Sequence, residues 1–263
     1  MRANPLLHHF RARATRPLIN AWMSLPDSYA AEVIGHAGVD SVTVDLQHGM
    51  MGFDQMLPML QAISSTPATP LVRVSTCEPA TIMKVLDAGA YGIICPQVDN
   101  AEICRRFVSA CLYPPSGNRS FGPSRGLTYG GSDYVTKSEG ELLLLAMIES
   151  REALDNLDDI LDVPGLSGIY IGPNDLALSM GYMPGVVITE VEQAIERVLQ
   201  TALSRGLFVG IFCADECNAK KRVEQGFHLV TPGNDAGILR KSYQYYCQSL
   251  CGVQESWGQN GGY

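Results

Sequence analysis

Short apolar runs alternate with amphipathic segments along almost the whole chain. The run Leu142–Ile148 ends abruptly at Glu149, and a second run, Gly168–Ile171, ends in a Gly-Pro-Asn-Asp turn. Between the two runs, residues 151–161 carry apolar side chains at the spacing of an amphipathic helix. This stretch predicts a strand, a helix and a second strand, with an acidic residue at or just beyond the carboxyl end of each strand.

The same alternation continues on both sides of this stretch and predicts eight strands in all. Several of the predicted helices end in a glycine, which supplies the left-handed residue that turns the chain back into a sheet. Eight strand–helix repeats in 263 residues favour an α/β fold with a single (β/α)₈ TIM barrel over a doubly wound sheet. No G-x-G-x-x-G follows a predicted strand, which argues against a dinucleotide-binding sheet. The predicted strands span residues 17–25, 40–45, 70–74, 91–95, 142–148, 168–171, 207–212 and 227–231.

We expect residues 1–263 to form one TIM-barrel domain, because barrels of this kind often run to about 250 residues as one unit. Residues 1–17 are predicted to be a polar lead-in, and residues 252–263 a flexible, Gly-rich tail. Residues 116–141 lack a clear periodicity and are long for a connector. We therefore expect a functional loop there that carries some helix.

Composition excludes several classes of partner. The net charge is −8 and the sequence has no basic cluster, so neither nucleic acid nor an anionic membrane is expected as a main partner. No apolar run approaches the ~20 residues of a membrane span, and the N-terminal residues lack the apolar core of a signal peptide. The eight cysteines contain no C-x-x-C pair, which favours reduced thiols in a cytoplasmic protein over a zinc site.

Two carboxylates follow neighbouring predicted strands. Because the carboxyl ends of parallel strands meet on one face of a barrel, Glu149 and Asp175 are expected to lie close together. Their mutual repulsion would be relieved by a cation, and their hard oxygen atoms suit Mg²⁺, Mn²⁺ or Co²⁺. The alternative is structural: either carboxylate caps a helix or pairs with Arg151.

Two further polar side chains are expected on the same face. Asp45 precedes His48 by three residues, and a carboxylate that accepts from one ring nitrogen would make the other a general base; the alternative is a structural histidine. Arg73 ends a strand that is expected to be buried, so it needs an anion, either a substrate oxygen or a neighbouring carboxylate such as Glu149. Backbone N–H groups of Asn174 and Asp175, in the turn that also contains Gly172 and Pro173, are candidates to hold a substrate carboxylate.

Lysine is missing from the predicted strand ends. The five lysines all fall in predicted helices or in the long loop. Schiff-base chemistry needs a desolvated lysine in the pocket, so carbanion chemistry in this barrel is expected to depend on a metal.

Six segments, in order along the chain, resemble those of the HpcH/HpaI aldolases, which are metal-dependent (class II) pyruvate aldolases. The resemblance covers residues 18–250 or so and departs from the family pattern at Met147, Asn174 and Ser120. The matching segments are Ala21-Trp22, Val44–Gly49, Pro70–Arg73, Tyr113–Arg119, Ile148–Ala153 and Tyr170–Leu176.

The resemblance implies a barrel of the phosphoenolpyruvate/pyruvate type and a role for each matching residue. Glu149 and Asp175 would bind the divalent metal that chelates pyruvate, and Arg73 would contact the keto oxygen. His48, oriented by Asp45, would serve the acid and base steps. It also implies a homo-oligomer, usually a hexamer in this family, in which Asp87 reaches a neighbouring subunit's site. Trp22 and Phe212 are further substrate-binding candidates.

The activity expected from this resemblance is the reversible cleavage of 4-hydroxy-2-oxo acids into pyruvate, or a close analogue, and an aldehyde. Two other functions stay open at this point. One is a citrate- or malyl-thioester-type lyase on a related barrel, although the sequence has no basic patch suited to a CoA arm. The other is a non-catalytic protein that binds an oxo acid through the same metal.

Overall fold

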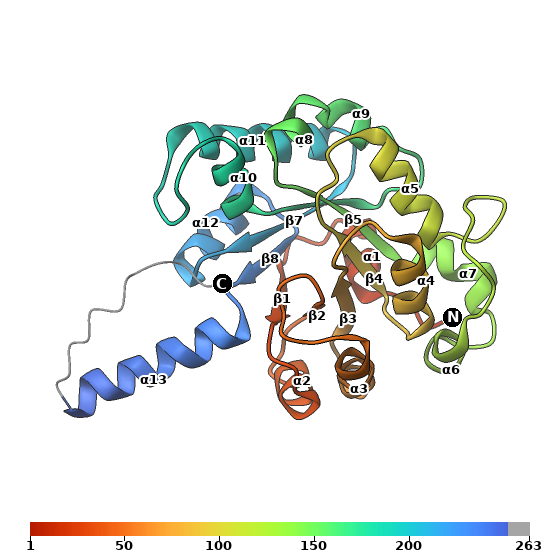
Figure 1. Ribbon diagram of the computed structural model, residues 1–263, viewed down its shortest axis with the longest axis horizontal. Coiled ribbons are helices and arrows are strands. Elements are labelled where there is room, and N and C mark those ends of the chain that lie inside the picture. The colour runs from red at the N-terminus through yellow and green to blue at the C-terminus, as the bar shows by residue number, and fades with distance from the viewer. Residues whose placement is uncertain (252–263) are drawn as a thin grey trace.

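The eight predicted strands form a closed parallel barrel in the order β1 to β8, with β8 paired back to β1 (Figure 1). The computed structural model describes residues 1–251, so the predicted flexible tail, residues 252–263, lies outside the described residues. The predicted (β/α)₈ barrel is therefore confirmed. The strands are β1 (Leu18–Met23), β2 (Ser41–Asp45), β3 (Thr69–Arg73), β4 (Gly92–Cys95), β5 (Leu143–Ile148), β6 (Gly168–Ile171), β7 (Phe208–Cys213) and β8 (Leu229–Pro232).

Two apolar layers hold the barrel together. The outer layer lies between the strands and the surrounding helices, and the inner layer fills the barrel with side chains such as Leu71, Leu145 and Phe208. Because each strand is covered on both faces, its sequence is an almost continuous apolar run, as expected for parallel sheets. The helices around the barrel are α2 (Ser28–Gly35), α3 (Phe53–Ser64), α4 (Pro79–Asp87), α5 (Ala101–Cys111), α8 (Arg151–Asp155), α9 (Leu157–Leu161), α10 (Pro173–Ser179), α11 (Thr189–Ser204) and α12 (Glu216–Gln225).

The helix predicted over residues 151–161 is in fact two short helices, α8 and α9, with a break at Asn156. The side-chain amide of Asn156 donates to the backbone carbonyls of Asp99 and Glu152, at 2.9 and 3.1 Å. Asparagine competes in this way with the backbone hydrogen bonds of a helix. The apolar periodicity is the same for one helix as for two, so it did not reveal the break.

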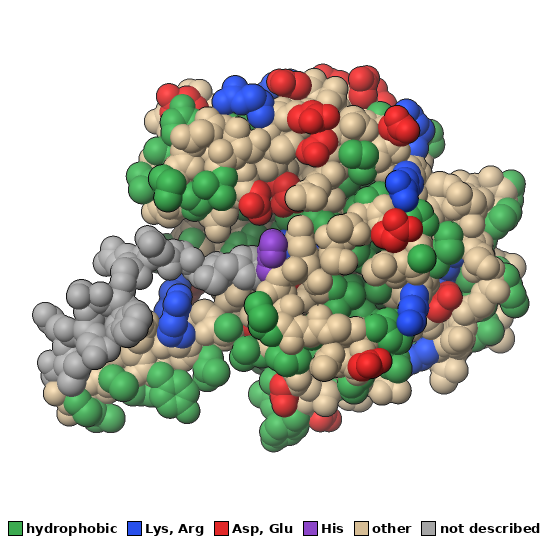
Figure 2. Space-filling model, viewed as in Figure 1, with side chains coloured by type: hydrophobic (Ala, Val, Ile, Leu, Met, Phe, Trp, Pro, Cys, Tyr) green, Lys and Arg blue, Asp and Glu red, His purple; other side chains and the backbone are tan. Residues whose placement is uncertain are grey.

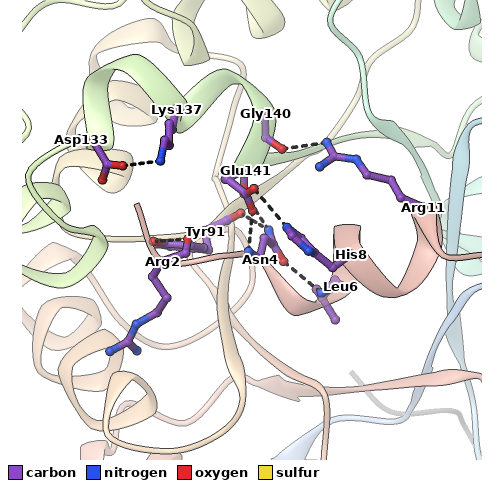
Figure 3. Close-up of polar contacts among 10 residues, drawn as sticks. All are labelled: Arg2, Asn4, Leu6, His8, Arg11, Tyr91, Asp133, Lys137, Gly140 and Glu141. Carbon is purple, nitrogen blue, oxygen red and sulfur yellow. Dashed lines mark hydrogen bonds and ion pairs between the residues drawn. The ribbon is translucent and has the colours of Figure 1, made fainter.

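The polar lead-in contains a helix that the sequence analysis did not predict, α1 (Pro5–Arg11). Asn4 caps α1 by accepting from the backbone N–H of Leu6, as Figure 3 shows. Leu6 and Leu7 are buried among the side chains that fill the barrel interior. The lead-in therefore closes the N-terminal end of the barrel. Its apolar signal is two leucines beside a run of histidines and arginines, which is too short to be recognised by periodicity.

The long connector, residues 116–141, contains two helices, α6 (Ser124–Gly130) and α7 (Tyr134–Glu141). It contacts the N-terminal end of the chain: Arg2 donates its backbone N–H to Gly130, and Glu141 accepts from Asn4 and pairs with His8. The expectation of some helix in this connector is confirmed. A function for it stays a prediction.

The last described helix, α13 (Asp235–Cys251), projects away from the barrel (Figure 1). None of its side chains is buried in the part of the chain that the structure describes. Within residues 1–251, no helix is both long and apolar enough to cross a membrane. All eight cysteines are free, and Cys217, Cys247 and Cys251 are exposed.

Candidate active site

Asp45 and Arg73 form a buried ion pair at the carboxyl ends of β2 and β3. The two residues are register partners on adjacent strands, and their side chains are 0% and 3% exposed. Arg73 Nε donates to Asp45 Oδ1 at 2.7 Å, and its second guanidinium nitrogen donates to Oδ2. The predicted need of Arg73 for an anion is therefore met by Asp45, and no hydrogen bond to Glu149 accompanies it in the described structure.

Asp45 also organises the turn that follows β2. Its Oδ1 accepts the backbone N–H of Gln47 and of His48, at 3.0 and 3.3 Å, and its Oδ2 accepts the indole N–H of Trp22 at 3.1 Å. The Arg73 guanidinium lies 4.8 Å from the centre of the Trp22 ring. The D-x-x-H spacing thus lets one carboxylate fix both the guanidinium and the backbone of the turn. The predicted pairing of Asp45 with the imidazole of His48 stays a prediction.

Glu149 directly follows β5 and is 5% exposed. Its Oε1 accepts the backbone N–H of Gln97 at 2.8 Å, whereas its Oε2 is buried without a hydrogen-bond partner among the described residues. Burial raises the pKa of Glu149 to about 7, and the negative charge of Asp175 adds to this effect. The carboxylate is therefore costly to ionise where it stands, and a cation at Oε2 would offset that cost.

Gly172 provides the space beside that oxygen. A side-chain carbon at Gly172 would lie 2.7 Å from Glu149 Oε2, so any larger residue would collide with the carboxylate. Gly172 also precedes α10, whose first turn contains Asp175. The turn after β6 thereby brings the second carboxylate to the same rim of the barrel.

Glu149 and Asp175 are the residues that would hold a divalent ion. No group of three or more His, Cys, Asp or Glu side chains with metal-binding geometry occurs within residues 1–251. Two carboxylates with further positions for water and substrate oxygens suit Mg²⁺ or Mn²⁺, which keep such ligands in enzymes. The unpartnered Oε2 of Glu149 fits this assignment.

A small cavity of about 30 Å³ lies over Arg73 and brings together all of the predicted substrate-binding residues. Glu149 and His48 are not among the residues that line it, and His48 is exposed. Its lining consists of Trp22, Arg73, Met147, Tyr170, Gly172, Pro173, Asn174, Asp175 and Phe212.

Asp87 does not line this cavity. It is the last residue of α4, and its Oδ1 accepts from the buried guanidinium of Arg119 at 2.7 Å. Its predicted contribution to a neighbouring subunit's site stays a prediction.

Sequence reasoning missed Gln97 and Tyr170. Gln97 adopts a positive φ of 54° and donates its backbone N–H to Glu149. Tyr170 donates its hydroxyl to Thr231 at 2.7 Å and packs against Trp22. The position of Gln97, two residues beyond a predicted strand, was the available signal, because residues at strand ends form the functional face of a barrel.

Comparisons with known proteins find relatives of this chain in one family. The family model described as HpcH/HpaI aldolase/citrate lyase matches residues 18–242. The hydroxypyruvate/pyruvate aldolase of Rhizorhabdus wittichii is 43% identical over 226 residues, which cover 85% of this chain and 90% of that protein. The 4-hydroxy-2-oxo-heptane-1,7-dioate aldolase of Escherichia coli is 37% identical over 233 residues, covering 88% and 89%. An HpcH/HpaI aldolase/citrate lyase family protein from Burkholderia cenocepacia superposes with a TM-score of 0.89, at 29% identity, over 95% of this chain and 100% of that one.

Proposed function

Because the chain belongs to the HpcH/HpaI aldolase/citrate lyase family, we propose that it cleaves 4-hydroxy-2-oxo acids reversibly into pyruvate, or a close analogue, and an aldehyde. The relatives named as aldolases support a carbon–carbon lyase that acts on an oxo acid and an aldehyde. The observation that carries the proposal is the buried Oε2 of Glu149, which has no partner among the described residues and lies on the same rim as Asp175 and the Asp45–Arg73 pair.

Glu149 and Asp175 hold the divalent ion in this proposal. When bound, that ion supplies Lewis-acid polarisation of the substrate ketone. Mg²⁺ or Mn²⁺ is the expected ion, with Co²⁺ as a third candidate, since the protein donors are carboxylate oxygens.

Arg73 stabilises the charge that develops on the keto oxygen. Cleavage of the C3–C4 bond leaves its electron pair on the pyruvate half as an enolate. The guanidinium is held in place by Asp45 before substrate arrives, so no reorganisation is needed as the charge forms. Trp22 and Phe212 pack edge to face in the lining of the same cavity.

His48 removes the proton of the C4 hydroxyl, directly or through one water molecule, and returns it in the reverse direction. Its exposed position just beyond β2 gives the imidazole access to solvent and to the rim of the barrel. Asp45 fixes the backbone of the turn from which His48 extends.

A homo-oligomer, with a hexamer as the expected form, is part of the same proposal. The helix α13 exposes large apolar side chains that the rest of residues 1–251 does not cover, and Figure 2 shows them along its outer side. Apolar surface of this kind marks an interface. These side chains are Ile238, Leu239, Tyr243, Tyr245, Tyr246 and Leu250.

The test is a panel of aldehydes incubated with pyruvate and Mg²⁺ or Mn²⁺, with products identified by mass. We expect 4-hydroxy-2-oxo acids, formed only while the metal is present and lost on addition of EDTA. Products that form equally well in EDTA would refute the metal assignment. Turnover of a CoA thioester with no aldol product would refute the function.

A further inference from the structure

A groove adjoins the cavity over Arg73 and is far larger than that cavity. It lies between α10, the loop that joins α10 to α11, and the first two turns of α11 and of α12. Pro173, Asn174 and Phe212 line both the groove and the cavity, so the two are continuous. We call this region the acceptor groove.

The volumes of the two spaces differ about ninefold. The cavity over Arg73 measures about 30 Å³, and the acceptor groove about 260 Å³. A water molecule occupies roughly 30 Å³ of liquid, so the groove has room for a chain of several carbon atoms. A reactant whose reacting carbon lies over Arg73 can therefore extend its remaining atoms into this groove.

Most of the groove wall is apolar. Val186 and Val187, in the loop between α10 and α11, are 67% and 79% exposed, and Figure 2 shows apolar side chains gathered over this loop. Ile188, Val191 and Phe212 continue the wall toward the barrel. An alkyl chain lying along these side chains would remove apolar surface from water, which is favourable in proportion to the area covered.

The charged groups that line the groove already have partners within the protein. Arg222, its one cationic residue, donates from its terminal nitrogens to Glu192 at 2.6 and 3.0 Å. Lys221 donates to the same carboxylate at 2.5 Å. Asp215, the other acidic residue of the lining, accepts the backbone N–H of Asn218 as the cap of α12. Among the residues described here, the lining therefore offers a carboxylate tail two acidic neighbours and no cation that is not already paired.

We propose that the acceptor groove selects uncharged aldehydes with an apolar chain of about three to five carbons and disfavours aldehydes that carry a carboxylate. The proposal rests on the proposed function, since it assigns the second substrate of the same reaction. Val186 and Val187 are its specificity-determining residues. They contact the chain of the aldehyde and not its reacting carbon.

The test compares kcat/KM for propanal, butanal, pentanal and succinic semialdehyde, each with pyruvate and Mg²⁺. We expect kcat/KM to rise about two- to fourfold with each methylene, since burial of one methylene group has this effect on an equilibrium constant. Succinic semialdehyde should fall below butanal. A flat dependence on chain length, or a preference for the anionic aldehyde, would overturn the proposal.

Val187→Lys provides the second measurement, with Val33→Lys on α2 as its matched control, because both valines are exposed and neither substitution disturbs the core. Val187→Lys should lower kcat/KM for pentanal and raise it for succinic semialdehyde, each by about tenfold or less. Val33→Lys should change neither. Equal behaviour of the two variants would count against the groove.

The exchange of pyruvate methyl protons in D₂O, followed by NMR without any aldehyde, separates this proposal from the proposed function. Exchange reports enolate formation alone, so it should persist in wild type and in both variants. If exchange occurs but kcat/KM for aldol formation does not depend on the chain length of the aldehyde, the groove proposal is refuted and the proposed function stands. No exchange in the wild type refutes the function, and the groove proposal with it.

Discussion

At the N-terminal end of the barrel, Asn4 is fully buried and each of its polar groups has a partner. Its amide nitrogen donates to the carbonyls of Tyr91 and Glu141, at 3.1 and 2.9 Å, and its Oδ1 accepts from Leu6, as Figure 3 shows. At the C-terminal end, Glu149 is almost as deeply buried, yet its Oε2 has no hydrogen-bond partner in the described chain. One barrel thus contains a buried polar residue that is fully satisfied and another that is not.

The difference separates stability from function. A satisfied buried polar residue fixes one structure, whereas an unsatisfied buried carboxylate destabilises the protein that contains it. Such a cost persists at positions where a ligand relieves it. In TIM barrels, residues at the C-terminal end of the strands usually serve function, and residues at the N-terminal end usually serve stability. Substitutions at the two ends should therefore have opposite effects.

The largest effect is expected from Glu149→Gln. Loss of one of two protein ligands for the metal should lower metal-dependent kcat/KM by roughly a thousandfold or more. In the presence of EDTA at pH 8, the same substitution should raise the free energy of unfolding by about 1–3 kcal/mol, because it removes a charge whose pKa burial has raised to about 7. Turnover assays and urea denaturation measure the two quantities.

Glu152→Gln is the control, because Glu152 is an exposed carboxylate of the same segment. It should leave both quantities near the wild-type values. If Glu149→Gln destabilised the metal-free protein, the carboxylate would be structural and the contrast between the two ends would fail. An active variant that is insensitive to EDTA would have the same consequence.

His48→Ala sharpens the assignment of roles at the C-terminal end. We expect a loss of about a hundredfold in aldol cleavage, which requires removal of a proton from a hydroxyl. Decarboxylation of oxaloacetate passes through the same enolate but needs no such proton transfer, so it should fall far less. Parallel assays of the two reactions test this. Equal losses in both would show that His48 binds or orients the oxo acid and is not the base.

Metal binding should depend on pH through Glu149. Its raised pKa means that the folded protein holds a proton below about pH 7, which a metal ion must displace. Metal affinity should therefore fall about tenfold per pH unit below that value and level off above it. By the same sign, the contribution of Glu149 to metal-free stability is fully present below its unfolded pKa, near 4.5, and is lost as pH rises through about 7.

Calorimetry in two buffers of different ionisation enthalpy gives the measurement. About one proton should be released per metal ion at pH 6, and almost none at pH 8. Proton release that is unchanged between the two pH values would exclude Glu149 as the titrating ligand.

The barrel could be predicted from the sequence because each strand and helix leaves a pattern within a short stretch of the chain. Each strand is an apolar run that ends at a polar tip, and glycines such as Gly89 and Gly226 adopt the positive φ expected where helices end. The same logic placed Arg73, Glu149 and Asp175 on one rim. The pairing of Arg73 with Asp45 depends on the register of β2 against β3, which no spacing along the chain reveals.

Contacts between distant segments were missed for the same reason. Gln97 reaches Glu149 across 52 residues, and Asn4 reaches Glu141 across 137. Neither pair leaves a periodic signal. The lead-in helix α1 escaped prediction because its two buried leucines are surrounded by polar residues.

The smallest effect on activity is expected from Asn4→Ala. This substitution should lower stability, whereas Glu149→Gln should raise the stability of the metal-free protein. Asn4→Ala removes the cap of α1 and the amide that donates to the carbonyl of Glu141. It also removes one of two donors to the carbonyl of Tyr91, which keeps the backbone N–H of Leu143. Loss of a cap costs about 1 kcal/mol, and loss of the hydrogen bond to the Glu141 carbonyl adds to this, so the free energy of unfolding should fall by about 1–3 kcal/mol. For a chain of this size, thermal unfolding should begin about 2–4 °C lower per kcal/mol.

Asn118→Ala, at an exposed asparagine, is the matched control and should leave the unfolding temperature unchanged. In Asn4→Ala, kcat/KM should stay within about twofold of wild type below the transition, because additive effects are expected for distant sites. A loss of kcat/KM comparable to that of His48→Ala would show that the lead-in helix shapes the active site through the barrel interior. The two ends would then be coupled through the side chains that fill the barrel, Leu6 and Trp22 among them, and the division between stability and function would not hold.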